Sequence, residues 1–147
     1  MGSLPPQGAG SGSGGGGGGT LDSVVVSAEN ENFVTSVSYA NAITLDLQTT
    51  TDHIIDIVNT DATIGMSYKV YASAKVSGTI PVDGDDSWYN VLNDTDSSTY
   101  DNDFAKSLPA TKKAREGLSN RYAWLRVQIK SDSGTPIAKI WVRGTNL

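Results

Sequence analysis

Apolar and polar residues alternate with a period of two along most of the chain after position 22. The segment 66–75, for example, places Tyr68 and Val70 on one face and Lys69 and Tyr71 on the other. This period is typical of a half-buried β-strand, whose successive side chains point to opposite faces of a sheet. The pattern predicts strands at 23–27, 33–39, 43–47, 53–58, 66–75, 87–92, 122–130 and 137–143.

Turn-forming residues separate these strands. Clusters of Asp, Asn, Gly, Ser and Pro lie at 59–61, 81–85 and 131–134, and such clusters favour tight turns. The third cluster joins two long strands directly, so we expect 122–130 and 136–143 to form a β-hairpin. About eight strands of this kind predict an all-β fold, an antiparallel β-sandwich.

The long connection over 93–120 adds two expectations. A long crossing between neighbouring strands indicates jelly-roll or Greek-key wiring. The connection also holds the one segment that favours a helix, because Pro109 suits a first helical turn and Gly117 suits the end. We therefore expect one short helix over 109–117.

The first 20 residues have a different composition. Ten of the chain's 16 glycines lie in the first 19 residues, and this part contains no charged side chain. Such a segment buries too little apolar area to fold alone, so it is either a flexible linker or an arm that packs on other subunits. We predict an N-terminal arm over 1–20 and one β-sandwich domain over 21–147. The candidate partner-binding residues of the arm are Gly14, Gly16 and Gly18.

Charge and composition exclude several classes of function. The net charge is −5 and the pI is near 4.6, which argues against binding to phosphate backbones, so no nucleic-acid partner is expected. No apolar run approaches the ~20 residues of a membrane-spanning helix, and no membrane partner is expected. The chain has no cysteine and a single histidine, His53, which we expect at a strand edge. We predict no enzymatic activity, no cofactor, and no catalytic or metal-binding residue.

Seven of the 16 acidic residues lie between positions 83 and 103. Hard cations such as Ca²⁺ bind several oxygen ligands, which an Asp-rich loop supplies. However, Asp83-Gly84-Asp85-Asp86 lacks the full calcium-loop pattern, so a solvated acidic loop is the favoured interpretation. A third alternative is that the loop faces the basic stretch 112–115.

Two tryptophans mark a candidate binding face. In the predicted hairpin, Trp124 and Trp141 share a strand face with Arg126 and Arg143, whereas the opposite face is aliphatic. A mixed Trp and Arg face is typical of protein interfaces, and it would also suit stacking on a sugar ring. The candidate partner-binding residues of the domain are therefore Trp124, Arg126, Trp141 and Arg143.

Three segments carry a resemblance to a known family. The segments 68–73 (Tyr-Lys-Val-Tyr-Ala-Ser), 87–91 (Ser-Trp-Tyr-Asn-Val) and 121–127 (Arg-Tyr-Ala-Trp-Leu-Arg-Val) are similar to a pattern in small virion proteins of tailed bacteriophages. The resemblance implies a capsid decoration (cement) protein, or a neck or tail component, located in the virion and assembled in the host cytoplasm. It further implies binding to the major capsid protein or other virion proteins, and a homo-oligomer, with a trimer favoured.

The same order of motifs also resembles discoidin-type carbohydrate-binding sandwiches, although this chain lacks that family's paired cysteines. The alternative function is therefore a carbohydrate-binding module, with or without Ca²⁺ in the acidic loop. In that case Trp88, Tyr89 or Trp124 would stack on the sugar.

Overall fold

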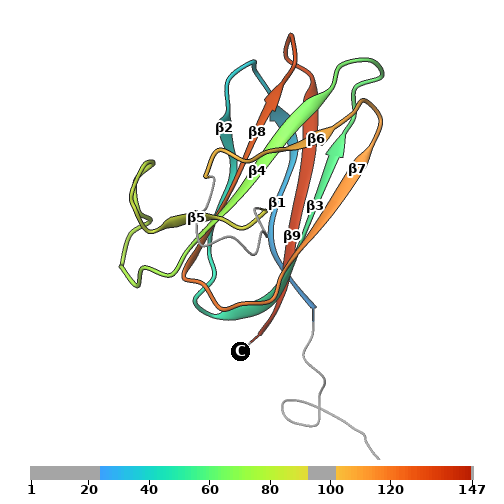
Figure 1. Cartoon of the computed structure of the whole chain (residues 1–147). Coiled ribbons are helices and arrows are strands. Elements are labelled where there is room, and N and C mark those ends of the chain that lie inside the picture. Colours follow the sequence, from blue (N-terminus) through green and yellow to red (C-terminus); the bar gives the residue numbers. More distant parts are fainter. Residues whose placement is uncertain (1–23, 93–101, 147) are drawn as a thin grey trace, which may run out of the picture.

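A computed structural model describes residues 24–92 and 102–146 (Figure 1). The predicted arm with Gly14, Gly16 and Gly18 lies outside the described residues, as do Asp94, Asp96 and Asp101 of the acidic cluster. The described part contains nine strands and no helix. The strands are β1 (Val24–Val34), β2 (Ala40–Asp46), β3 (Thr50–Asn59), β4 (Met66–Ser73), β5 (Trp88–Asn90), β6 (Lys106–Leu108), β7 (Lys113–Leu118), β8 (Trp124–Ser131) and β9 (Ile137–Asn146).

The strands form two antiparallel sheets that pack face to face as a sandwich (Figure 1). One sheet has the order β1-β9-β3-β7, and the other has the order β2-β8-β4-β5, with β6 also paired to β4. Apart from the steps β4 to β5 and β5 to β6, each connection crosses from one sheet to the other. This wiring is a jelly roll. The prediction of an all-β antiparallel sandwich is thus confirmed.

The core lies between the two sheets and consists of the apolar side chains that the period-two pattern places on one face. Ile57 of β3, Val70 of β4, Val127 of β8 and Ile140 of β9 are each 0% exposed. Their burial removes apolar surface from water, which is the main stabilising contribution to a fold of this size. Beside the edge strand β7, the Tyr68 hydroxyl of β4 donates to the Glu116 carboxylate of β7, and this hydrogen bond links the two sheets.

The predicted hairpin of 122–130 and 136–143 is wrong. β8 pairs with β2 and β4, whereas β9 pairs with β1 and β3 in the opposite sheet. The turn between them bonds to other loops, since the Ser131 and Asp132 amides donate to the Ser36 and Gly65 carbonyls at 2.8 and 2.9 Å. Both strands have one aliphatic face, and placing them in different sheets lets these faces bury each other across the core.

The predicted helix over 109–117 is also wrong. Thr111 has a positive φ of 66°, and from Lys113 the chain continues as β7 on the edge of the first sheet. Along β7 the exposed Lys113 and Arg115 alternate with the more buried Ala114 and with Leu118. This alternation matches the open edge of β3, whose ladder of hydrogen bonds outweighs a weak local preference for helix.

The predicted strand over 33–39 ends earlier than expected. β1 stops at Val34, and the chain then turns toward β2. Immediately after this end, the amide and the hydroxyl of Thr35 both donate to the Pro136 carbonyl, at 3.0 and 2.6 Å. The predicted alternation is confirmed in three strands, where Ile43 of β2, Ile57 of β3 and Val70 of β4 are buried and Thr44 and Ile54 are exposed.

Candidate functional site

The structure separates the four candidate residues of the domain. Trp124 and Arg126 lie on β8, and Trp141 and Arg143 lie on β9, so the two pairs occupy the outer faces of opposite sheets. The single mixed face expected from a hairpin does not exist. The molecule instead has two candidate surfaces, one on each side of the sandwich.

The first surface is the outer face of the sheet β1-β9-β3-β7. Its central cross-strand row runs from Glu29 through Trp141 and Asp56 to Arg115. The half-buried Trp141 ring donates from Nε1 to the Glu31 carboxylate at 2.7 Å. We call this surface the Trp141 face, and its main residues are Glu29, Glu31, Asp56, Arg115, Lys139, Trp141 and Arg143.

Charge is distributed unevenly over the Trp141 face. Arg115 donates two hydrogen bonds to the Asp56 carboxylate, of 2.7 Å from Nε and 2.9 Å from Nη2. The Arg115 hydrogen bond lowers the pKa of Asp56 below its usual value, and the charges of Arg115, Arg143 and Lys113 act in the same direction. A hollow of about 410 Å³ lies beside this pair, and Trp141 lines one of its walls. The face therefore combines one aromatic centre with fixed charges of both signs.

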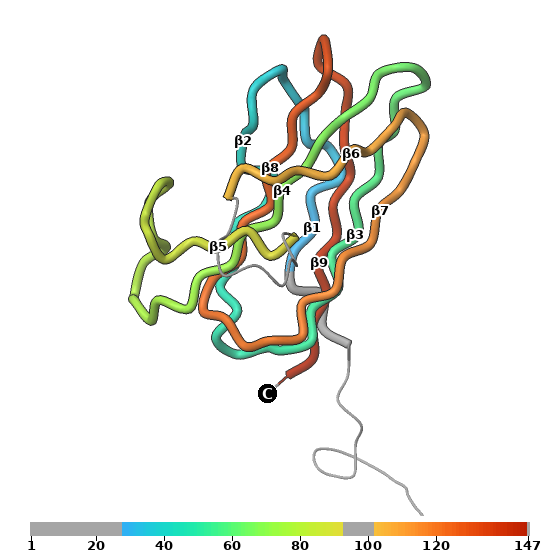
Figure 2. Tube along the Cα trace, viewed as in Figure 1, coloured from blue at the N-terminus to red at the C-terminus, as the bar shows by residue number. Residues whose placement is uncertain are grey.

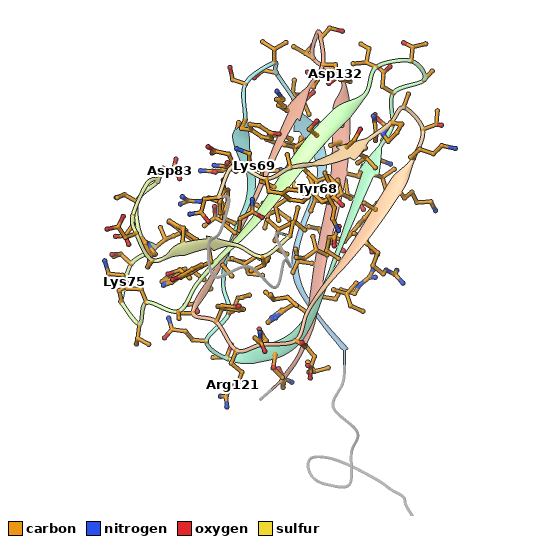
Figure 3. The ribbon with its side chains drawn as sticks, viewed as in Figure 1. Tyr68, Lys69, Lys75, Asp83, Arg121 and Asp132 are labelled. Carbon is orange, nitrogen blue, oxygen red and sulfur yellow. The ribbon has the colours of Figure 1, made fainter. Side chains whose placement is uncertain are left out.

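The second surface is a pocket on the outer face of the sheet β2-β8-β4-β5. The segment between β4 and β5 stands away from the sandwich (Figure 2), and a cavity of about 400 Å³ lies between this segment and the sheet. Figure 3 shows Asp83 on this segment and Lys69 on β4 beside it. We call it the Arg126 pocket, and it is lined by Lys69, Tyr71, residues 83–86, Trp88, Asn102, Asp103, Arg126 and Gln128.

The three segments that carry the bacteriophage resemblance converge at this pocket. They correspond to β4, to β5 and to the start of β8, which lie side by side in one sheet. Tyr71, Trp88 and Arg126 each come from a different one of these segments, and all three line the pocket. The sequence shows the three motifs, but their meeting depends on the pairing of β4 with β8, which lie more than 50 residues apart.

Arg126 is the most constrained group in the pocket. Its side chain is 8% exposed, and its guanidinium lies over the Trp88 ring, with Cζ 4.6 Å from the ring centre. Nη1 forms an ion pair with Asp83, and Nη2 donates to the Pro81 carbonyl at 3.4 Å. Nε has no hydrogen-bond partner among the described residues. Burial lowers the pKa of Arg126, but a guanidinium stays charged in proteins.

The burial of the tryptophans corrects the expected sugar contacts. Trp88 and Trp124 are only 5% and 8% exposed, and together with Ala123 they form a small apolar cluster beneath the pocket. Neither ring has a free face for stacking on a sugar. Tyr89 is 50% exposed, although it does not line the pocket.

The acidic loop makes specific ion pairs that the sequence did not indicate. Asp83 pairs with Arg126 and Asp85 pairs with Lys75, whereas Arg115 of the basic stretch pairs with Asp56 on the other sheet. The acidic loop therefore does not use Arg115 as its partner. Within 24–92 and 102–146, no group of three or more His, Asp or Glu residues could hold a metal ion.

Asp85 is held in its charged form. Its carboxylate accepts the Ser87 amide at 2.9 Å and the Lys75 ammonium at 2.9 Å. These contacts, the Ser87 amide first, lower the pKa of Asp85 to about 2. A carboxyl with a depressed pKa stabilises the fold above its usual pKa, and this contribution is lost as the pH falls toward 2.

We expect the Lys75→Met variant to raise the pKa of Asp85 while leaving it below the usual value of about 3.9, because the Ser87 amide remains. The measurement is a pH titration of the side-chain carboxyl carbon by NMR. Lys112→Met is the control and should leave the titration unchanged, because Lys112 lies immediately before β7 of the other sheet. An Asp85 that titrates near 3.9 in the parent protein would contradict this description of the loop.

His53 lies inside the molecule and not at a strand edge. β3 runs between β9 and β7, and His53 is 2% exposed, with Nε2 at 2.6 Å from the Thr50 hydroxyl. Burial lowers the pKa of His53. The ring is inaccessible to a substrate, so this position offers no catalytic site.

Comparison with protein-family models and with curated proteins finds no match for this chain. Among the described residues there is also no helix of the length and apolarity needed to cross a membrane.

Proposed function

We propose that this protein is a non-enzymatic structural component of a virion, which attaches to the capsid lattice as a decoration protein. The resemblance of three segments to tailed-bacteriophage virion proteins supports this role, and these segments form three adjacent strands of one sheet. Jelly rolls are frequent among capsid and lectin domains, and since a fold alone does not assign a function, the surface has to carry the proposal.

The Trp141 face is the observation that carries it. It is built on paired strands and so is rigid, and it presents a half-buried tryptophan between acidic groups on β1 and basic groups on β7. Tryptophan and arginine dominate the binding energy of protein interfaces, whereas flanking charges set the orientation of the partner. We infer that the partner is the major capsid protein or another virion protein.

The proposal includes the assembly around this contact. The protein forms a homo-oligomer, a trimer at a lattice position, and the arm over 1–20 reaches neighbouring subunits after assembly in the host cytoplasm. A neck or tail position is the alternative location. An ordered arm loses conformational entropy, so it adds affinity only through contacts with several subunits or through high local concentration.

The location is tested by counting the protein in purified particles of the virus whose genome carries this sequence. Quantitative mass spectrometry should find a copy number comparable with that of the capsid protein, since a decoration protein follows the lattice. A few copies per particle would place it at the neck or tail, and its absence from the particle would overturn the proposal.

The binding face is tested with particles that lack this protein. We expect Trp141→Ala to weaken rebinding of the purified chain by tenfold or more, as for a central interface tryptophan. Tyr89→Ala is the matched control, because it removes an exposed aromatic ring from the other sheet and should leave binding unchanged. Equal affinity of the two variants would exclude the Trp141 face as the attachment surface.

A further inference from the structure

The Arg126 pocket lies on the opposite sheet from the Trp141 face, so a lattice contact through that face leaves it unused. We propose that this pocket is a binding site for a neutral sugar. The inference goes beyond the structural role, and it depends on side chains of three strands, of the loop at 83–86 and of residues 102–103 before β6.

The first argument is the pairing of the basic groups on the pocket walls. Arg126 is paired with Asp83, and the Lys69 ammonium lies 3.5 Å from an Asp103 carboxylate oxygen. Lys75, which does not line the pocket, is paired with Asp85. Since each of these cations already faces a carboxylate, the walls present donors and acceptors side by side. A polyhydroxylated ring, which both donates and accepts, suits such walls.

The second argument is the fixed position of Arg126. The Arg126 guanidinium packs on the Trp88 ring and forms an ion pair with Asp83. The side chain therefore loses little conformational freedom when a ligand binds. The side chain is more than nine-tenths buried and its Nε has no partner among the described residues. A buried donor without a partner costs free energy, so a ligand hydroxyl or a bridging water that reached Nε would recover part of this cost.

Tyr71 supplies the apolar surface that the buried tryptophans do not. It lies beside Arg126 in the ladder between β4 and β8, and its ring is partly exposed in the pocket. Its hydroxyl donates to the Asn102 carbonyl at 2.5 Å, which fixes the ring orientation. Small-ligand sites combine apolar or aromatic walls with a few placed polar groups, and Tyr71 with Gln128 and Arg126 has this composition.

The same walls disfavour anions and divalent metal ions. An anion would approach the carboxylates of Asp83, Asp85, Asp86 and Asp103, which all line the pocket. A divalent cation would need several carboxylates that converge on one point, and no three of the described acidic residues are arranged in this way. A neutral ligand meets neither obstacle.

The test uses the purified full chain on an array of neutral, sialylated and sulfated glycans. We expect binding to at least one neutral glycan, and saturation-transfer NMR with the methyl glycoside of its terminal sugar should show contact. Tyr71→Ala and Gln128→Ala should each weaken array binding by tenfold or more. Trp141→Ala, which removes an aromatic ring from the opposite sheet, should leave it unchanged. Thermal unfolding of each variant confirms that the domain is folded.

Four results would overturn the proposal: no glycan bound by the parent protein, binding to sialylated or sulfated glycans alone, full binding by folded Tyr71→Ala and Gln128→Ala, or loss of binding in Trp141→Ala. None of these results bears on particle attachment, which is measured by rebinding of the purified chain to particles that lack this protein. The glycan site and the structural role therefore succeed or fail separately.

Discussion

Gly144→Ala lowers the free energy of unfolding by about 1–3 kcal/mol, the usual cost of adding a methyl group to a packed site. A Cβ at position 144 would lie 2.6 Å from Cδ2 of His53 and 3.2 Å from the Thr51 carbonyl oxygen. The His53 ring cannot easily move away, because it is 2% exposed and is held by the Thr50 hydroxyl. The measurement is urea denaturation of the parent protein and the variant.

Gly117→Ala is the matched control for this substitution. Gly117 also lies in the first sheet, on β7, but no atom lies within 4 Å of a Cβ built there. We expect no loss of stability, or a gain of up to about 1 kcal/mol from the lower conformational entropy of the unfolded chain. If the two variants lost the same stability, the cause would be a general effect of alanine in this sheet, and the close contact with His53 would be wrong.

A second substitution separates steric conflict from other causes. Replacing His53 by alanine removes the ring that the new methyl group meets, although it also leaves a cavity. The double variant should therefore be more stable than the sum of the two single effects predicts, because residues in contact do not act additively.

The second large effect concerns the buried charge of Arg126. Asp83→Ala removes its counter-ion and leaves a guanidinium that is 8% exposed. We expect a loss of about 1–3 kcal/mol in the free energy of unfolding, the range for a buried polar group that loses its partner. This is below the cost for a fully buried pair, since the Asp83 side chain is 66% exposed and water can replace part of its interaction. A shift of the urea midpoint at constant slope measures it.

A further change in the same background tests the cause. Arg126→Met removes the charge and leaves an apolar side chain that packs on Trp88, so Asp83→Ala with Arg126→Met should be more stable than Asp83→Ala alone. Asp103→Ala is the comparison, because the Asp103 side chain is 93% exposed and lies 3.5 Å from the Lys69 ammonium, which also contacts the Tyr39 ring at 4.2 Å. We expect a smaller loss than for Asp83→Ala, since water replaces more of this interaction. A double variant less stable than Asp83→Ala would show that the buried charge is not the cause.

Several features of the fold could be predicted from single strands. The alternation over 53–58 and 66–75 identifies Ile57 and Val70 as core residues, and both are fully buried. The segment 109–117 favours a helix in the sequence because its proline and glycine suit the helix ends, while its own alternation is short. The open edge of β3 decides its conformation, and this edge cannot be recognised from the segment itself.

The candidate surfaces were predictable only in their components. The aliphatic faces of 122–130 and 137–143 are evident in the sequence, and Val127 and Ile140 bear them out. Trp124 and Trp141 were expected together because a short turn joins their strands. The crossing of this turn between the sheets separates them, whereas the pairing of β8 with β4 places Arg126 beside Tyr71.

The sequence by itself determined most of the strands, β6 and β7 excepted, and which side of most of them is buried, since the two-residue period records both in local order. The tertiary structure alone decided which strands are neighbours, because the hydrogen bonds of a sheet join residues that are far apart in the chain. That choice put Trp141 on one outer face. It also brought Lys69, Asp83 and Arg126 into one pocket on the other face.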